Sequence, residues 1–398
     1  MLNVASKLWM PFTQMDSFDP AQRNFIRGEG NYLIDANGRR AFDAVSSIWT
    51  TIHGHCRPEI VEAIAWQAAT LDHATLLGAT NSIAEELAER LAALLQLDRV
   101  FYACDGASAV EAALKMALGF WQAAGYPERT RFIRLIDAYH GDTAGAMSVS
   151  GIEVFRSRFD AITFESRVYG GDPELLRAPD VAAVIVEPIV QAAAGMRIVD
   201  RELYEPLRDM EPLLIVDEIA TGFGRTGTMF AHEQLDLKPD VVCVGKGLSG
   251  GALPLSATAV KARVFEAFLG GPQERKQFFH GHSYAGNPIA CAAALANLAI
   301  FENDRTLDHV GVLNGELDRL LNPLSAHPHV REVRRAGLMA AIEVDAGAIA
   351  PWQLTNELYA RGQFTRPIGN VIQLVPPLSS SVPELARFTG DLLAALDA

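Results

Sequence analysis

Short apolar runs alternate along the chain with longer segments rich in alanine and leucine. Runs of β-branched and aromatic residues predict strands at residues 99–103, 131–136, 182–188, 213–218 and 240–246. Helical spacing of the apolar positions predicts helices at residues 57–71, 82–97, 108–125 and 287–303. Continuously apolar strands separated by helices are typical of an α/β fold with a mainly parallel central sheet that is covered by helices on both faces.

The pattern changes after about residue 305. We predict helices at 310–323, at 351–362 and at the C-terminus, with β-rich stretches at 329–344 and 371–378. Near the N-terminus, "GNYLIDANGRRAFDAV" (30–45) predicts two short strands around an Asn-Gly turn. These segments predict a smaller α+β domain made of residues 1–55 and 305–398, beside a large domain of residues 56–304.

Composition and charge narrow the possible functions of this 398-residue chain. The formal net charge is −14, which argues against nucleic acid or an anionic membrane as a partner. An anionic substrate must therefore be held by a few placed arginines. The four cysteines have no disulfide or metal-binding spacing, and we expect no metal site. We find no signal peptide and no apolar stretch of membrane-spanning length, so we expect a cytoplasmic protein.

The stretch "LLIVDEIATGFGRTG" (213–227) places Asp217 at the end of a buried strand. Open α/β sheets bind ligands at that edge, although a solvated strand end would explain a lone aspartate about as well. The same stretch contains "GFGRTG" (222–227), a formal match to the dinucleotide-binding fingerprint. That fingerprint should follow its strand directly and open a helix. Here "IAT" intervenes, so we reject a nicotinamide-dependent oxidoreductase.

The stretch "VVCVGKGLSGG" (241–251) sets Lys246 between two glycines at the end of the next predicted strand. If the two strands are parallel, Lys246 and Asp217 emerge at one edge of the sheet. That pair indicates pyridoxal phosphate (PLP): a lysine amine forms a Schiff base with the aldehyde, and a carboxylate keeps the pyridine nitrogen protonated. Taken alone, an exposed structural lysine is the simpler explanation.

Three further stretches supply groups that PLP requires. In "CDGASAVEAALKMAL" (104–118), Gly106 and Ala107 are expected to form a turn before a helix capped by Ser108, which provides backbone N–H groups for a phosphate or a plain helix cap. Tyr139 follows a strand and can stack on the pyridine ring, while His140 and Asp142 are expected to order the turn. Residues 281–283 precede a helix and predict a second phosphate contact.

Together and in this order, these motifs resemble the fold-type I PLP enzymes, specifically the class III (ω-type) aminotransferases. "DEIATGFGRTG" (217–227) marks the broad class. "LWMPFTQM" (8–15), "YHGDTAGAMS" (139–148) and "RPIG" (366–369) followed by "PP" are similar to a narrower family, the 7,8-diaminononanoate synthases of biotin biosynthesis. The resemblance covers nearly the whole chain and implies an aminotransferase that converts 8-amino-7-oxononanoate to 7,8-diaminononanoate.

The resemblance also implies roles for single residues. Lys246 would be the Schiff-base lysine, Asp217 the partner of the pyridine nitrogen, and Tyr139 the ring that stacks on the cofactor. Arg366 would grip the substrate carboxylate, because its planar guanidinium binds a carboxylate through two hydrogen bonds. The resemblance also implies phosphate contacts from Gly106 and Ala107 and substrate contacts from Phe12 and Trp49. Contacts across a homodimer interface would come from Gly281, His282 and Ser283.

Some positions depart from the family pattern. Enzymes that take the amino group from S-adenosylmethionine usually have two adjacent tryptophans where this chain has Ile48-Trp49, and often a tyrosine where it has Phe12. Fewer aromatic walls favour lysine over a sulfonium donor. Residues 151–181 are shorter than the same region in the family, and Ala107 replaces a hydroxyl residue. The alternative function is another class III ω-aminotransferase, which would act on ω-amino acids or diamines.

Overall fold

The computed structural model describes residues 7–17 and 23–398. Its largest sheet has seven strands in the order β4-β12-β11-β10-β7-β5-β6. All pairings are parallel except those that β12 makes with its neighbours β11 and β4. The strand bounds are β4 Arg99–Ala103, β5 Arg131–Leu135, β6 Arg167–Tyr169, β7 Val181–Val186, β10 Leu213–Asp217, β11 Val241–Val244 and β12 Ser256–Val260. The predicted α/β fold with a mainly parallel sheet is confirmed.

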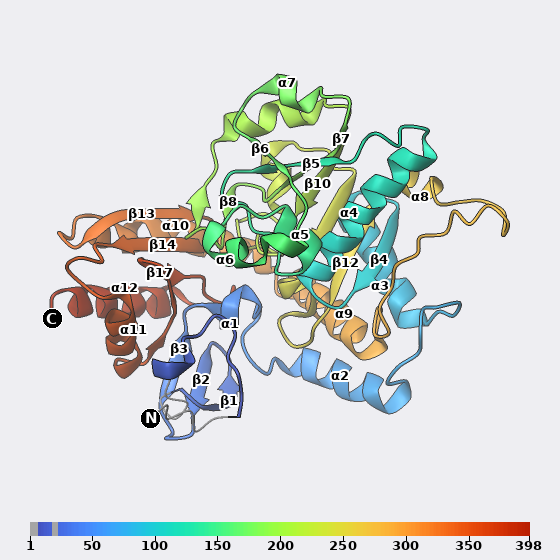
Figure 1. Ribbon diagram of the computed structural model, residues 1–398. Coiled ribbons are helices and arrows are strands. Elements are labelled where there is room, and N and C mark those ends of the chain that lie inside the picture. Colours follow the sequence, from blue (N-terminus) through green and yellow to red (C-terminus); the bar gives the residue numbers. More distant parts are fainter. Residues whose placement is uncertain (1–6, 18–22) are drawn as a thin grey trace.

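Helices cover both faces of this sheet because its central strands are apolar on both sides. In β10, Leu213 and Ile215 belong to the core cluster that α4 (Gly106–Ala123) joins, whereas Leu214 and Val216 belong to the opposite cluster. Alternate residues of a strand point to opposite faces, so a strand between two helical layers must be apolar throughout. The opposite layer contains α3 (Ser82–Leu95) and α9 (Pro288–Asn303) (Figure 1).

Two strands of the large sheet escaped the sequence analysis. β12 is antiparallel to both neighbours and reads "SATAV", which is short and only weakly hydrophobic. β6 has three residues at the sheet edge. All five predicted strands exist, and their bounds differ from the prediction by up to two residues.

The N- and C-terminal segments form two smaller four-stranded sheets (Figure 1). The first has the order β1-β2-β3-β15 and contains β1 Phe25–Glu29, β2 Tyr32–Asp35, β3 Arg40–Asp43 and β15 Gln363–Phe364. β15 pairs with β3, so the two ends of the chain share a sheet. The second has the order β13-β14-β17-β16, with β13 Val330–Ala336, β14 Met339–Val344, β16 Pro367–Ile368 and β17 Val371–Leu374. The domain boundaries at residues 55 and 305 stay a prediction.

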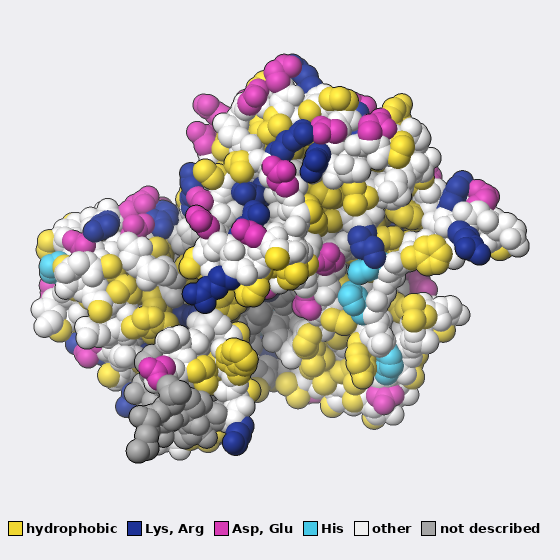
Figure 2. Space-filling view, in the orientation of Figure 1, with side chains coloured by type: hydrophobic (Ala, Val, Ile, Leu, Met, Phe, Trp, Pro, Cys, Tyr) yellow, Lys and Arg dark blue, Asp and Glu magenta, His cyan; other side chains and the backbone are white. Residues whose placement is uncertain are grey.

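Helices complete the smaller sheets and the outer layers. The described α-helices not yet given are α1 Ser46–Trp49, α2 Pro58–Thr70, α5 Ala144–Ser148, α6 Glu153–Arg156, α7 Pro173–Leu176, α8 Ala262–Glu266, α10 Thr306–Ser325, α11 Pro351–Ala360 and α12 Val382–Leu396. Within residues 7–17 and 23–398, none of the helices has the length and apolar character needed to span a bilayer. Acidic and basic side chains are interspersed on the face shown in Figure 2.

Candidate active site

A cavity of about 460 Å³ opens at the carboxyl edge of the large sheet. Four neighbouring parallel strands deliver side chains to it, because parallel strands end at the same edge. Tyr139 follows β5, Glu187 follows β7, Asp217 ends β10 and Lys246 follows β11. The cavity is lined by Trp49, Asp105, Gly106, Ala107, Tyr139, His140, Gly141, Asp142, Thr143, Glu187, Ala192, Ala193, Asp217, Ile219, Ala220 and Lys246.

Asp217 is fixed in the cavity wall by two hydrogen bonds. Its Oδ1 accepts from the backbone N–H of Ile219 at 3.0 Å, and its Oδ2 pairs with Nδ1 of His140 at 2.7 Å. Both side chains are buried. A carboxylate only accepts, so Nδ1 of His140 carries the hydrogen. The sequence had predicted only that His140 orders the turn. Its contact with Asp217 also orients the carboxylate that faces the cavity.

Lys246 is the first residue of a short 3-10 helix, η5 (Lys246–Ser249), and has a left-handed φ of 39°. Its Nζ lies 4.7 Å from the centre of the Trp49 ring. Burial lowers the pKa of Lys246, and the charges of Asp217 and Glu187 oppose that shift. A lowered pKa leaves more of the amine neutral, which is the form that attacks a carbonyl. Gly247 packs closely here, since a Cβ would lie 2.9 Å from Cδ1 of Ile52 and 3.2 Å from the Cβ of Phe223.

The first turn of α4 forms another wall of the cavity. Here the sequence prediction was wrong in detail: Gly106 and Ala107 are the first residues of the helix and not a preceding turn, and the N-cap is Asp105 and not Ser108. Asp105 accepts from the N–H of Ser108 at 2.8 Å. The first N–H groups of a helix have no partner within it and carry partial positive charge, so they suit an anion such as a phosphate.

The turn that contains Tyr139 is held by carboxylates from two other positions. The backbone N–H of Tyr139 donates to Glu187 at 2.9 Å, and its hydroxyl donates to Asp142 at 2.9 Å. Burial raises the pKa of Tyr139, with Asp142 adding to the shift. Gly141 has a φ of 127° and packs so closely that a Cβ would lie 2.5 Å from the Cβ of Ala107. The turn therefore lies directly against the start of α4.

Glu187 is a cavity residue that the sequence analysis did not single out. It is buried, and burial together with the nearby Asp217 raises its pKa from 4.5 to about 8. Its oxygens accept from the N–H groups of Tyr139 and Ala192. The available signal was its position: Glu187 directly follows the apolar strand "VAAVIV", just as Asp217 ends the neighbouring one.

These groups fit PLP. The cavity combines the half-buried amine of Lys246, a buried carboxylate and the free N–H groups of the first turn of α4 within one volume. Lys246 would hold the aldehyde carbon, Asp217 the pyridine nitrogen, and Gly106 and Ala107 the phosphate. Tyr139 lines the same cavity, where its ring could cover the cofactor.

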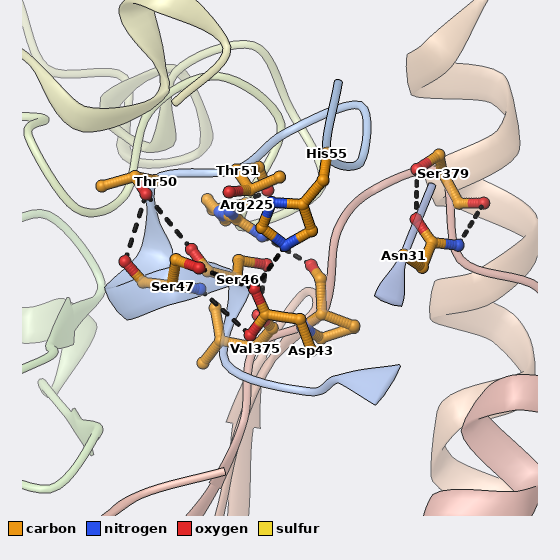
Figure 3. A network of polar contacts seen from close by, with 11 residues as sticks. Asn31, Asp43, Ser46, Ser47, Thr50, Thr51, His55, Arg225, Val375 and Ser379 are labelled. Carbon is orange, nitrogen blue, oxygen red and sulfur yellow. Dashed lines mark hydrogen bonds and ion pairs between the residues drawn. The ribbon is translucent and has the colours of Figure 1, made fainter. Parts of the chain in front are cut away.

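Trp49 lines the cavity and belongs to a strained segment, whose polar contacts are drawn in Figure 3. All four residues of α1, Ser46 to Trp49, have φ between 47° and 66°, which is the left-handed region and costs about 1–2 kcal/mol per residue. Polar contacts hold the segment in place. Asp43 accepts from the N–H and hydroxyl of Ser47 at 3.1 and 2.8 Å and pairs with His55 at 2.8 Å. Buried side chains thus impose a conformation that the local sequence does not favour.

Arg225, in the stretch of residues 222–227, does not line the cavity. Its guanidinium donates to the carbonyl oxygens of Pro376 at 2.6 Å and Thr51 at 3.0 Å (Figure 3). Burial lowers the pKa of Arg225 to about 9, and Asp43 opposes that shift. Arg225 therefore ties Thr51, which lies just after the strained segment, to Pro376.

Phe12 and Arg366 lie together outside the lining of this cavity. Nη2 of Arg366 donates to the backbone carbonyl of Phe12 at 3.3 Å. The Phe12 ring packs edge-on against Phe155 at 5.2 Å between centroids, and Phe155 packs against Tyr139 at 6.0 Å. Burial lowers the pKa of Arg366. This aromatic row connects the arginine to the Tyr139 side of the cavity.

The predicted phosphate contact at residues 281–283 is not brought to this cavity within one chain. Gly281 and His282 line a separate cavity of about 230 Å³, together with Leu77 and other residues of that surface. Ser283 is absent from the linings of both cavities. α9 begins only at Pro288, with Asn287 as its N-cap, so residues 281–283 do not immediately precede it.

The chain is similar to known proteins over nearly its whole length. A family model described as Aminotransferase class-III matches residues 15–170 and 171–396. The adenosylmethionine-8-amino-7-oxononanoate aminotransferase of Geobacter sulfurreducens is 39% identical, and the match covers 95% of this chain and 93% of that protein. The crystal structure of the enzyme of that name from Methanocaldococcus jannaschii has a TM-score of 0.94 at 39% identity, covering 98% of this chain and 97% of that one.

A second solved structure is similar at a lower identity. An amine transaminase from an uncultivated Pseudomonas species, solved with PLP bound, has a TM-score of 0.91 at 33% identity and covers 98% of both chains. The family match extends over almost the whole chain, and the relatives are matched over nearly their full lengths. The chain belongs to the class III aminotransferases, which are PLP-dependent enzymes.

Proposed function

We propose that this enzyme transfers an amino group to 8-amino-7-oxononanoate and forms 7,8-diaminononanoate, a reaction of biotin biosynthesis. The observation that carries the proposal is the arrangement around Lys246. An aromatic wall, Trp49, lies beside the amine, and an arginine suited to a carboxylate, Arg366, lies beyond the row of aromatic rings. A substrate with a long apolar chain and a terminal carboxylate matches both. The names of the relatives at 38–40% identity support the same substrate.

In this proposal each residue around the cavity has a defined role. PLP, when bound, supplies a carbonyl that exchanges amino groups and a ring that withdraws electrons. Nζ of Lys246 holds the cofactor and then moves a proton at the reacting carbon, since its lowered pKa lets it act as base and as acid. Asp217, oriented by His140, keeps the pyridine nitrogen protonated. The hydrogen bond from Tyr139 to Asp142 sets the angle of the ring that covers the cofactor.

We further propose a homodimer in which Gly281, His282 and Ser283 serve the partner's cavity. Exposed apolar side chains surround this segment: Leu77 is 72% exposed, Phe279 67% and Tyr284 66%. His73 packs against Tyr284 at 5.0 Å, so the patch joins the loop after α2 to the segment before α9. In Figure 2, apolar side chains gather over α2, the helix that precedes His73. Contiguous apolar surface of this kind is typical of a protein interface.

The amino donor is the second part of the proposal. The pair Ile48-Trp49 lacks one of the two adjacent tryptophans and favours lysine, whereas the relatives carry adenosylmethionine in their names. We propose lysine, because a sulfonium gains from each aromatic face that it contacts and this pocket has lost one. An Ile48→Trp variant is expected to improve S-adenosylmethionine as a donor relative to lysine.

One assay tests the proposed acceptor and the proposed donor. Purified enzyme with PLP and 8-amino-7-oxononanoate is given lysine, S-adenosylmethionine or alanine, and 7,8-diaminononanoate is measured. Product with any donor supports the acceptor, and the donor with the highest kcat/KM identifies the amino source. No product with any of the three, together with activity on ω-amino acids or diamines, would replace the proposal by the other ω-aminotransferase function.

A further inference from the structure

Gln373 is a buried polar residue in the apolar strand β17, and it is 1% exposed. Burying an amide is costly unless each of its polar atoms finds a partner. Neither the cofactor contacts nor the proton transfer described above uses this side chain. A buried amide at this position therefore calls for a reason of its own.

Each end of the Gln373 amide contacts a different part of the substrate region. Its Oε1 accepts from the indole Nε1 of Trp49 at 2.9 Å. Its Nε2 donates to the backbone carbonyl of Arg366 at 2.8 Å. One side chain thus connects the aromatic wall at Lys246 to the backbone of the arginine proposed to hold the carboxylate.

Chemistry fixes the orientation of this amide. An indole N–H can only donate, and a carbonyl can only accept. The bridging side chain must therefore present an acceptor to Trp49 and a donor to Arg366, which an amide does. A methionine of the same length offers neither a strong acceptor nor a donor, and an ionised glutamate offers only acceptors.

The bridge rests on a rigid support. Gln373 pairs with Ala341 of β14, and its backbone carbonyl accepts from the hydroxyl of Thr365 at 2.7 Å. Trp49, by contrast, belongs to the strained left-handed segment. Because local backbone preference does not hold that segment, the position of the indole depends on tertiary contacts such as this one.

We propose that Gln373 is a positioning residue that fixes Trp49 relative to Arg366 and thereby sets the length of substrate that the enzyme accepts. The inference rests on the proposed function, since it takes the carboxylate of the keto substrate to bind at Arg366. The distance between the reacting carbon and the carboxylate of the substrate is then matched to a fixed gap between Trp49, which lies beside Lys246, and Arg366. Gln373 spans that gap through its two hydrogen bonds.

The main test compares two acceptors, 8-amino-7-oxononanoate and its homologue with one methylene fewer. In the wild type the longer acceptor should be preferred in kcat/KM, because one methylene is typically worth 10- to 200-fold. Gln373→Met should lower that preference by about tenfold and raise the KM for 8-amino-7-oxononanoate more than it lowers kcat. The matched control is Gln67→Met, because Gln67 in α2 is also buried but donates to the backbone carbonyl of Leu71, which follows that helix.

A second measurement does not depend on activity. The chain has five tryptophans, so the indole N–H groups of 15N-labelled protein give five resolvable NMR signals. Trp49→Phe identifies the Trp49 signal. That signal should shift in Gln373→Met and stay nearly unchanged in Gln373→Glu, because a carboxyl group, ionised or protonated, keeps an acceptor for the indole.

The outcomes separate the two proposals. A Gln373→Met enzyme with the wild-type chain-length preference overturns the positioning role, whatever its melting temperature. An unmoved Trp49 signal overturns the contact itself. If Gln373→Met does not fold, Gln373→Leu, which also lacks both polar groups, takes its place in the acceptor comparison, with the same expected loss of preference. A wild type inactive on 8-amino-7-oxononanoate overturns the proposed function, while the indole signals still test the contact.

Discussion

Two regions of this molecule are assembled in different ways. The cofactor side, made of Lys246, Asp217, Glu187 and the Tyr139 turn, is built from the ends of adjacent parallel strands. The proposed substrate side, made of Trp49, Arg366 and Phe12, is built from segments that tertiary contacts bring together. Trp49 and Gln373, for example, are 324 residues apart. The comparison shows that sheet topology alone can place the groups around Lys246, whereas the strained segment with Trp49 depends on contacts to the smaller sheets.

The largest expected effect is at the centre of the cofactor side. Lys246→Ala should abolish the Schiff-base absorbance of the bound cofactor and lower kcat by several orders of magnitude, because the variant lacks the amine that acts as nucleophile and as proton carrier. Spectroscopy and turnover of the purified variant measure this. The control is Lys261→Ala, since Lys261 pairs with Asp240 and follows β12, which ends at the opposite edge of the sheet. A Lys246→Ala enzyme with normal turnover would refute the assignment.

On the proposed substrate side, Arg366→Ala should weaken the binding of 8-amino-7-oxononanoate by roughly 2–4 kcal/mol of free energy. The loss should lower kcat/KM, mainly through a higher KM. The variant should still bind PLP, because Arg366 does not line the cofactor cavity. Steady-state kinetics and a cofactor titration measure the two effects. Arg361→Ala is the control, since Arg361 pairs with Glu357 of α11. If KM and kcat/KM do not change, Arg366 has no role in binding the carboxylate.

Glu187 provides a test through stability and pH. Its pKa is raised to about 8 in the folded protein, so Glu187 favours the folded state at low pH and loses that contribution as pH rises from about 4.5 to 8. In the cofactor-free protein, Glu187→Gln should flatten the pH dependence of unfolding over that range, by an amount of order a few kcal/mol. Denaturant unfolding at several pH values measures it. The exposed Glu174→Gln variant should behave as wild type, and a Glu187→Gln variant that follows the wild-type curve would contradict the prediction.

The smallest effect concerns the strained segment. Ser47 has a φ of 48° and donates its hydroxyl to Asp43. Ser47→Ala and Ser47→Gly both lose that bond, but glycine adopts positive φ without strain. The glycine variant should therefore be more stable than the alanine variant by about 0.5–1 kcal/mol, the reverse of their order in a right-handed helix. Denaturant unfolding compares them, and the ordinary order would show that the segment is not strained.

The cofactor side could be predicted in large part because its signal is local. Asp217 and Lys246 each lie at the end of an apolar run, and parallel topology then brings them together. Details of the first turn of α4 were wrong, since Asp105 caps the helix in place of Ser108. Glu187 had the same kind of strand-end signal as Asp217. The part played by His140 became visible only with its contact to Asp217.

The sequence by itself determined the α/β class, the positions of the five predicted strands along the chain and the chemical groups at their ends. Strand periodicity and strand ends are local properties of the chain. Only the tertiary structure decided the left-handed segment at Ser46 to Trp49, the antiparallel β12 and the bridge made by Gln373. The physical reason is the same in each case. Local preference is weak or opposed there, so distant contacts that bury and satisfy polar groups select the conformation.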